Sequence, residues 1–354
     1  MIEIIIGMFK KRKKRWSHKK KYDVEDNIMN TSPIISVIMP SLNVEDYMRQ
    51  CLKSVLNQSL TDIEVICIDA GSTDKTVDII KECQKDDDRI KFLTSDKKSY
   101  GYQVNMGLKE AKGKYISIIE TDDYISSNMF ETLYSLSEDD TIDIIKSNFF
   151  YLNDYDENDV QIKIDVAKRN LVNDGVFTLK EEPLIVEGHP SIWAGIYRRD
   201  FLIDNNIKFL EVPKGGWVDN PFFYETAIKA EKIRYINDAF YYYRITNPNS
   251  STNDFGDNKL PMQRILDIYD VFERCGEDDL NVVLMFYIRI FRYVEIILEN
   301  TDGGLDSLDY DTCAIIQKVL SKVDESLVKE YMNKNFKALY YKFMSPLVLL
   351  KFNT

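Results

Sequence analysis

The chain has 354 residues, of which 44% are hydrophobic, enough for one sizeable α/β domain and a further helical part. Its net charge of −12 is unevenly spread, because residues 10–21 carry nine Lys and Arg and no acid. The rest of the chain is therefore strongly acidic, which argues against nucleic acid as the principal partner. The five cysteines lack the spacing of a metal site, so we expect small buried side chains in a reducing compartment.

The N-terminal segment 1–32 is predicted to be basic and flexible. Two interpretations stay open: a solvated tail, or attachment to an anionic membrane surface, which the apolar residues around the basic run favour. The apolar start 2–8 is too short for a secretory signal. The sequence has no run of eighteen apolar residues, so no transmembrane helix is predicted. We therefore expect a cytoplasmic protein, with peripheral attachment to the inner face of the cell membrane as the open alternative.

In residues 33–148, apolar runs alternate with helical patterns. Strands are predicted over 35–39, 63–68, 90–93 and 115–119, with helices between them. This alternation is typical of βαβ units and a mostly parallel sheet, whose ligands bind beyond the carboxyl ends of the strands. The polar residues Asn43, Asp69 and 120–123 all follow strands at that edge, which favours a nucleotide site.

The segment Glu120-Thr121-Asp122-Asp123 directly follows the fourth predicted strand. Adjacent carboxylates repel one another unless a cation lies among them. Because side chains alternate along a strand, Glu120 and Asp122 are expected to point the same way and Asp123 away. The pair suits a divalent cation that also holds phosphate oxygens. The alternative is an acidic turn in which an Asp or Ser caps a helix near Ser126.

After residue 148 the chain changes character. The acidic stretch 151–165 is predicted to be an exposed excursion or a hairpin. The two tryptophans Trp193 and Trp217 either stack on a sugar ring or belong to the core. The region 253–354 shows amphipathic spacing and is predicted to form helices that cap the domain. Its apolar, basic end, 340–352, is either core packing or a second interfacial contact.

Two stretches, 40–80 and 99–125, together resemble the glycosyltransferase family 2 domain. They share a proline and an asparagine after the first strand, a glycine-serine-threonine-aspartate turn, and paired acids after the fourth strand. The resemblance is strong over 34–148 and weaker to about 252. It implies a GT-A fold, an α/β nucleotide-binding sandwich over 33–252, with a nucleotide-sugar half at 33–148 and an acceptor half at 149–252. The segment 99–105 looks like that of bacterial members from surface-polysaccharide loci.

The resemblance implies an inverting glycosyltransferase that moves a sugar from a nucleotide-sugar donor, expected to be a UDP-sugar, to a hydroxyl of a glycan or lipid-linked acceptor. A divalent cation, Mn or Mg, would be held by Asp122 with help from Glu120, which stands where aspartate is usual. The implied donor-binding residues are Pro40, Leu42, Asn43, Asp69, Gln103, Asn105, Glu120, Thr121, Asp122 and Arg244.

On the acceptor side, the resemblance implies that Asp219 is the general base. The alternative is that Asp219 caps a helix over 221–230, whose N-terminus would lower its pKa. His189, Trp193 and Trp217 are the acceptor-side candidates, and His189 is the competing base. Arg244 suits a diphosphate by its fork geometry, with a surface ion pair as its alternative.

Two rival classes are weighed against this function. A nucleotidylyltransferase-like enzyme would carry a glycine-rich basic loop after the first strand, which residues 40–44 lack. A catalytically inactive nucleotide-sugar-binding protein would have lost acids such as Asp122 and Asp219, which are present. Both observations favour the glycosyltransferase.

Overall fold

The computed structural model describes residues 32–154, 160–164, 175–213, 215–248, 258–346 and 348. Residues 1–31 form a unit of their own, and Ser32–Thr354 form another compact unit. The predictions of a flexible basic tail and of its attachment to a membrane fall on residues 1–31 and so lie outside the described residues. The fold below is that of the second unit.

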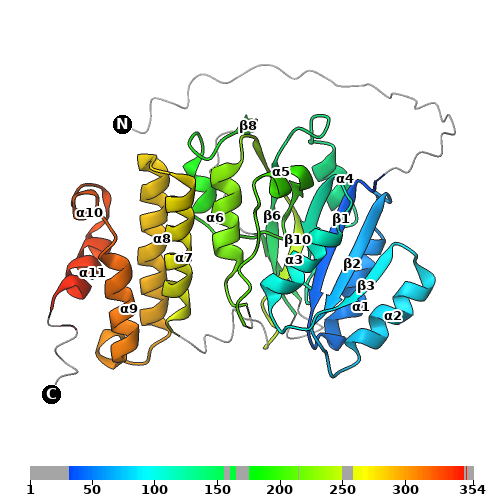
Figure 1. The fold of residues 1–354 in the computed structure, drawn as a ribbon. Coiled ribbons are helices and arrows are strands. Elements are labelled where there is room, and N and C mark those ends of the chain that lie inside the picture. The colour runs from blue at the N-terminus through cyan, green and yellow to red at the C-terminus, as the bar shows by residue number, and fades with distance from the viewer. Residues whose placement is uncertain are drawn as a thin grey trace. The chain divides into compact units, whose positions relative to one another are not determined.

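The strands that the structure describes form one sheet in the order β3-β2-β1-β4-β9-β6-β10-β5, with β7 beside β6 and β8 beside β10 (Figure 1). The strands are β1 (Ile35–Ser41), β2 (Ile63–Asp69), β3 (Ile90–Thr94), β4 (Tyr115–Ile118), β5 (Tyr124–Ile125), β6 (Ile144–Asn153), β7 (Gln161–Ile164), β8 (Val176–Phe177), β9 (Gly195–Arg198) and β10 (Ile233–Arg244). The pairs β1–β2, β2–β3, β1–β4 and β6–β10 are parallel, while β9 runs antiparallel between β4 and β6. The predicted α/β class with a mostly parallel sheet is confirmed.

The first half of the sheet follows the pattern of the sequence closely. Every residue of β1 and β2 is buried, as expected for parallel strands that are covered on both faces. The helices α1 (Glu45–Leu56), α2 (Thr76–Asp86) and α3 (Tyr100–Glu110) provide the crossovers. Both strands run further than predicted, so Ser41 and Asp69 still pair within the sheet. This register places the polar loops after β1 and β2 side by side.

The second half joins distant parts of the chain. The short elements here are α4 (Met129–Tyr134), η1 (Pro183–Val186), α5 (Arg199–Asp204) and α6 (Asp219–Lys229). The acidic stretch after β6 returns as β7 and pairs antiparallel with β6, so the hairpin interpretation is confirmed for the described part of 151–165. β10 pairs with both β6 and β5, so the segment 233–244 lies in the sheet beside strands that are about a hundred residues earlier in the chain.

The C-terminal region is helical, as predicted. It consists of α7 (Leu260–Cys275), α8 (Leu280–Glu299), η2 (Gly304–Ser307), α9 (Tyr310–Leu320), α10 (Glu325–Tyr331) and α11 (Lys334–Met344). α7 packs against α6, α8 and α9, and α8 also contacts η1. In Figure 1 these helices lie to the left of α6, while β3 lies at the right of the view. α8 buries Phe286, Ile290 and Val294 at helical spacing, which attaches it to the core.

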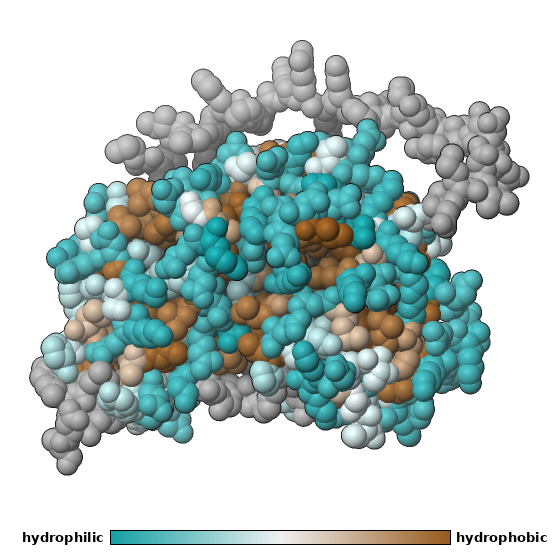
Figure 2. Space-filling model, viewed as in Figure 1, coloured by the Kyte–Doolittle hydropathy of each residue, from teal (hydrophilic) through white to brown (hydrophobic). Residues whose placement is uncertain are grey.

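The described surface gives no sign of a membrane-spanning element. Among the residues that the structure describes, no helix is both long and apolar enough to cross a bilayer. Figure 2 shows hydrophobic residues in small groups separated by hydrophilic ones on the face in view. In the described part of the apolar segment 340–352, Tyr340 and Phe343 are buried in the core, while Tyr341 and Met344 are exposed.

Candidate active site

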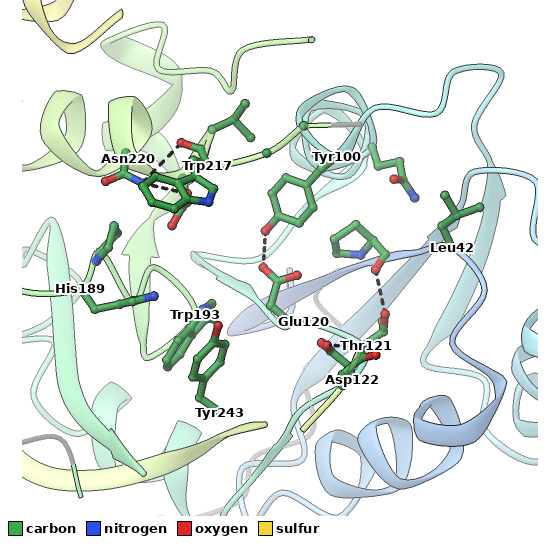
Figure 3. A pocket seen from close by; sticks show the side chains of 18 of the residues that line it. Leu42, Tyr100, Glu120, Thr121, Asp122, His189, Trp193, Trp217, Asn220 and Tyr243 are labelled. Atoms are coloured by element: carbon green, nitrogen blue, oxygen red, sulfur yellow. Dashed lines mark hydrogen bonds between the residues drawn. The ribbon is translucent and has the colours of Figure 1, made fainter. Parts of the chain in front are cut away.

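A cavity of about 1010 Å³ lies at the carboxyl ends of β1 and β4. Its lining comes from five parts of the chain: residues 40–44, 98–103, 120–122, 187–193 and 215–220, and it is completed by the second half of α8 and by β10. Figure 3 shows Tyr100, Glu120 and Asp122 on one side of this space and His189, Trp193 and Trp217 on the other. Residues far apart in the sequence therefore meet at the sheet edge predicted to bind a ligand.

The loop after β1 forms one wall of the cavity. Pro40, Leu42 and Asn43 all line it, and Leu42 is 38% exposed. The Pro40 carbonyl accepts a hydrogen bond from the Thr121 hydroxyl at 3.1 Å, which joins the ends of β1 and β4. Gln103 also lines the cavity, but its Nε2 donates to the backbone carbonyls of Ser41 in β1 and Ile68 in β2, at 3.0 and 2.7 Å. Its amide therefore fastens α3 to the sheet.

Asp69 and Asn105 do not line the cavity. The Asp69 carboxylate accepts hydrogen bonds from Gly71 N, Ser72 N and the Ser72 hydroxyl, and so shapes its own turn. Asn105 donates to the Phe209 carbonyl and accepts from the Phe209 N–H, both at 2.9 Å, which binds α3 to the next segment. The structure thus gives both residues a role in holding loops, and their direct contact with a donor stays a prediction.

Glu120 and Asp122 both line the cavity, whereas Asp123 does not. Asp123 is 1% exposed and accepts hydrogen bonds from the Tyr241 hydroxyl and the Arg244 N–H, both at 2.7 Å. Glu120 and Asp122 therefore face the cavity and Asp123 does not, as predicted, but Thr121 lines it too and β4 ends at Ile118, so a turn and not strand alternation produces this arrangement. The helix-cap alternative is wrong, because α4 begins only at Met129 and no side chain caps it.

Burial raises the pKa of both cavity carboxyls. The pKa of Glu120 rises to about 8, because desolvation and the charges of Asp122 and Asp219 outweigh a 2.5 Å hydrogen bond from the Tyr100 hydroxyl. Burial also raises the pKa of Asp122, against a 2.8 Å hydrogen bond from Asn247 Nδ2. Two desolvated carboxylates favour a nearby cation, since its charge would offset their repulsion.

A divalent ion fits this pair only with help from other ligands. The described ranges contain no group of three or more His, Cys, Asp or Glu side chains able to enclose a metal. Magnesium in phosphate-transfer sites is commonly bound by one or two carboxylates, with substrate phosphates and water in the remaining positions. Asp122 and Glu120 match that arrangement.

Arg244 lies beneath the acidic segment and does not line the cavity. It is buried, its Nε donates to the Asp122 carbonyl at 2.8 Å, and its guanidinium forms an ion pair with Asp154. The ion-pair alternative is therefore present, with Arg244 buried and Asp154 23% exposed, and a contact of Arg244 with a diphosphate stays a prediction. The family resemblance also implies that the segment 243–251 closes over the donor diphosphate, and residues 249–251 of it lie outside the described part of the chain.

Asp219 lines the cavity as the first residue of α6. The capping alternative is wrong, since the N-cap is Val218 and no side chain caps the helix. The expected lowering of the pKa is also wrong in direction. Burial raises the pKa of Asp219, and the charge of Arg289 and a hydrogen bond from Asn220 oppose the rise only in part. A carboxylate with a raised pKa binds a proton more readily, which suits a general base.

An aromatic group faces the acids across the cavity. Trp193 is buried and stacks on Tyr241 and Tyr243, with ring centroids 4.1 and 5.2 Å away. His189 lies against Trp193, and its Nδ1 accepts a hydrogen bond from the Ser191 N–H at 3.0 Å. This hydrogen bond occupies Nδ1, and the role of His189 as the competing base stays a prediction.

Trp217 stands where α6 approaches α8. Its backbone is left-handed, with φ of 60°, and its ring meets Tyr293 edge-on at 5.0 Å. Trp217 and all the other acceptor-side candidates line the cavity, as do most of the predicted donor-side residues.

The sequence interpretation missed several residues of the lining, above all Tyr100, Asn220, Arg289 and Tyr293. Gly101 explains the place of Tyr100, because a Cβ at Gly101 would collide with the Leu210 carbonyl and push α3 away. Arg289, Arg292 and Tyr293 lie within a mostly apolar stretch of α8. Charged residues within an apolar helical face are the signal that could have revealed this contribution.

Comparison with known proteins agrees with this geometry. The model of the family "Glycosyl transferase family 2" matches residues 36–202. An uncharacterized glycosyltransferase of Haemophilus influenzae is 30% identical over 226 residues, which cover 63% of this chain and 84% of that protein. EpsJ, an uncharacterized glycosyltransferase of Bacillus subtilis, is also 30% identical over 226 residues, and the match covers 62% of this chain but only 63% of EpsJ.

A solved structure shares the fold. S. aureus TarS 1–349 in complex with UDP-GlcNAc has a TM-score of 0.67 and 19% sequence identity, with 90% of this chain and 91% of that chain covered. The fold and the glycosyltransferase relatives together define a glycosyltransferase of the α/β class. The chain belongs to glycosyltransferase family 2. The predicted family and enzyme class are therefore confirmed, and the nucleotidylyltransferase and inactive-protein alternatives are set aside.

Proposed function

We propose that the chain is an inverting glycosyltransferase that transfers a sugar from a nucleotide-sugar to an acceptor hydroxyl by a single displacement. The observation that carries the proposal is one cavity with a carboxylate pair at the end of β4, Glu120 and Asp122, and a separate carboxylate, Asp219, at the start of α6. The pair of Glu120 and Asp122 suits the charged diphosphate end of a donor. Asp219, on the other side of the cavity, is placed to accept the proton of an acceptor hydroxyl, which suits direct attack by the acceptor.

The residues take different parts in this reaction. The loop of Pro40 to Asn43 would line the nucleoside, and Asp122 with Glu120 would hold a divalent cation, Mn or Mg. When bound, such a cation stabilises the negative charge of the leaving diphosphate. Asp219 takes the proton of the acceptor hydroxyl as its oxygen attacks the anomeric carbon, and the nucleoside diphosphate departs from the opposite side. Trp193 and Trp217 bind sugar rings on the acceptor side.

The substrates are proposed by class. A UDP-sugar is the donor to test first, because TarS, whose fold is similar, was solved with UDP and with UDP-GlcNAc. The acceptor is a glycan or a lipid-linked sugar. A lipid-linked acceptor agrees with the basic N-terminal segment, which we propose attaches the enzyme to an anionic membrane surface from the cytoplasmic side.

The decisive experiment compares Asp219→Asn with His189→Ala, with transfer rate and donor dissociation constant measured for each. Loss of the base should lower the rate on the order of 10²–10⁴-fold. Donor affinity should stay nearly unchanged, because the β1 and β4 contacts remain. Asn keeps the size of the side chain and one acceptor oxygen for the Asn220 amide, so a folding defect is not expected. Near-normal transfer by Asp219→Asn would remove Asp219 from the mechanism, and a product with retained anomeric configuration would remove the single displacement.

A further inference from the structure

We infer that Arg289, from α8, is a positioning residue for the base: it holds the backbone of 186–188 and, through Asn220, orients the carboxylate of Asp219. The inference rests on the proposed function, because it gives Arg289 a task toward the base that this function requires. It makes the C-terminal helices a part of the active site. The family match at 36–202 includes neither α8 nor Asp219.

The Arg289 guanidinium is 4% exposed and is used for hydrogen bonds to backbone and hydroxyl groups. Its Nη2 donates to the carbonyls of Val186 at 2.7 Å, Glu187 at 3.2 Å, and Gly188. Its Nε donates to the Tyr224 hydroxyl of α6 at 3.1 Å. Burying a guanidinium costs free energy unless its donors are satisfied in this way. One side chain therefore joins α8, α6 and the segment that follows η1.

The Asn220 amide passes this constraint to Asp219. Asn220 Oδ1 accepts from the Tyr293 hydroxyl at 2.5 Å and, at 3.4 Å, from Arg289 Nη1. Because both donors face the oxygen, the NH₂ group must point the other way. There Nδ2 donates to Asp219 Oδ1 at 3.2 Å and to the Trp217 carbonyl at 3.4 Å. The amide cannot reverse without facing two donors with its own donor, so α8 fixes the direction of the hydrogen bond that Asp219 receives.

A second buried cation holds the same loop from the other side. Lys146 of β6 is fully buried, and its Nζ donates to the carbonyls of Pro190 at 3.0 Å and Ser191 at 2.5 Å. His189 lies between the carbonyls bound by Arg289 and those bound by Lys146. Contacts from α8 therefore hold both Asp219, through Asn220, and the backbone next to His189. This arrangement fits a role of Arg289 in positioning.

The test uses three variants of the full chain: Arg289→Lys, Arg289→Met and Tyr293→Phe. Displacing a catalytic group by about 1 Å costs on the order of 10²-fold in rate. We expect kcat to fall roughly 10- to 10²-fold in Arg289→Met and several-fold in Tyr293→Phe. The donor KM should stay within about twofold, because the donor wall of β1 and β4 does not touch Arg289. Arg289→Lys keeps the charge but loses the fork, and should lie between Arg289→Met and the unmodified enzyme.

The pH profile adds a readout that a merely structural role would not move. The charged and titratable groups that face Asp219 are Arg289 and Tyr293 from α8, Tyr100 from α3, Glu120 after β4 and Tyr197 from β9. Arg289 is the one cation among them, so its removal should move the acid limb of kcat to higher pH. Arg289→Lys should leave that limb close to its original position.

Arg274→Gln is the matched control, because Arg274 also joins the C-terminal helices to α6, through Glu225 at 3.3 Å, yet it is 57% exposed and far from the lining. It should keep the original kcat and pH profile. If Arg289→Met does not fold, Tyr293→Phe and Arg289→Lys carry the test. Unchanged kcat in the variants beside an inactive Asp219→Asn would overturn the inference alone. An active Asp219→Asn would overturn the proposed function and the inference with it.

Discussion

The two neighbouring aspartates after β4 should differ in effect when each is changed to alanine: Asp123→Ala should lower the stability of the fold, and Asp122→Ala should abolish donor binding. Asp123 is 1% exposed, and its loss would leave the Tyr241 hydroxyl and the Arg244 N–H without their 2.7 Å acceptors. An unsatisfied buried donor costs about 1–3 kcal/mol, so two cost about 2–6 kcal/mol. Burial raises the pKa of Asp123 well above its usual range, so removing this carboxyl also recovers some desolvation free energy. We expect Asp123→Ala to lower the free energy of unfolding by about 2–4 kcal/mol.

Asp122→Ala should instead keep the fold and lose the donor. The Asp122 side chain lines the cavity and accepts one hydrogen bond, from Asn247, which water in the cavity can replace. We expect a change in unfolding free energy within about 1 kcal/mol. Urea titration gives the stability of each variant, and calorimetry with UDP and a divalent ion gives donor binding. Asp123→Asn is the matched control, because an amide still offers one acceptor to Arg244, and it should be less destabilised than Asp123→Ala. Equal stability of the two alanine variants would refute the separation of roles.

Three further outcomes are expected. A chelator should abolish transfer and ion-dependent donor binding, and Mn or Mg should restore both in the unmodified protein but not in Asp122→Ala; full activity in chelator would exclude the metal. Since burial raises the pKa of Asp219, kcat should fall as pH falls through a value above the ordinary carboxyl range of about 4, and a profile that stays flat to about pH 4 would contradict this. Deletion of residues 1–30 should spare turnover of a soluble acceptor analogue and weaken binding to anionic vesicles, most clearly at low salt; unchanged vesicle binding would reject the membrane role.

The sequence alone determined the half of the protein that is built from local patterns. Alternating apolar runs and amphipathic helices predict β1 to β4 and their crossovers, because burial of each element on the sheet requires that spacing. Parallel topology then places the carboxyl ends of these strands at one edge, so the pattern itself assigns the acids at 120–122 to a ligand site. The resemblance added Asp219, which the structure brings into the same cavity.

Only the tertiary structure decided how each polar side chain is used. Asp69 and Asn105 match the family motif, yet their polar atoms are occupied by nearby loops, and the pattern of a motif does not reveal such competition. Arg289 acts on carbonyls about a hundred residues earlier in the chain, and Glu120 meets Tyr100 from another element. Periodicity reports which face of a helix is buried but not what that face meets. Such contacts arise only when α8 packs on η1 and its side chains reach α6, so they depend on long-range packing that no local pattern encodes.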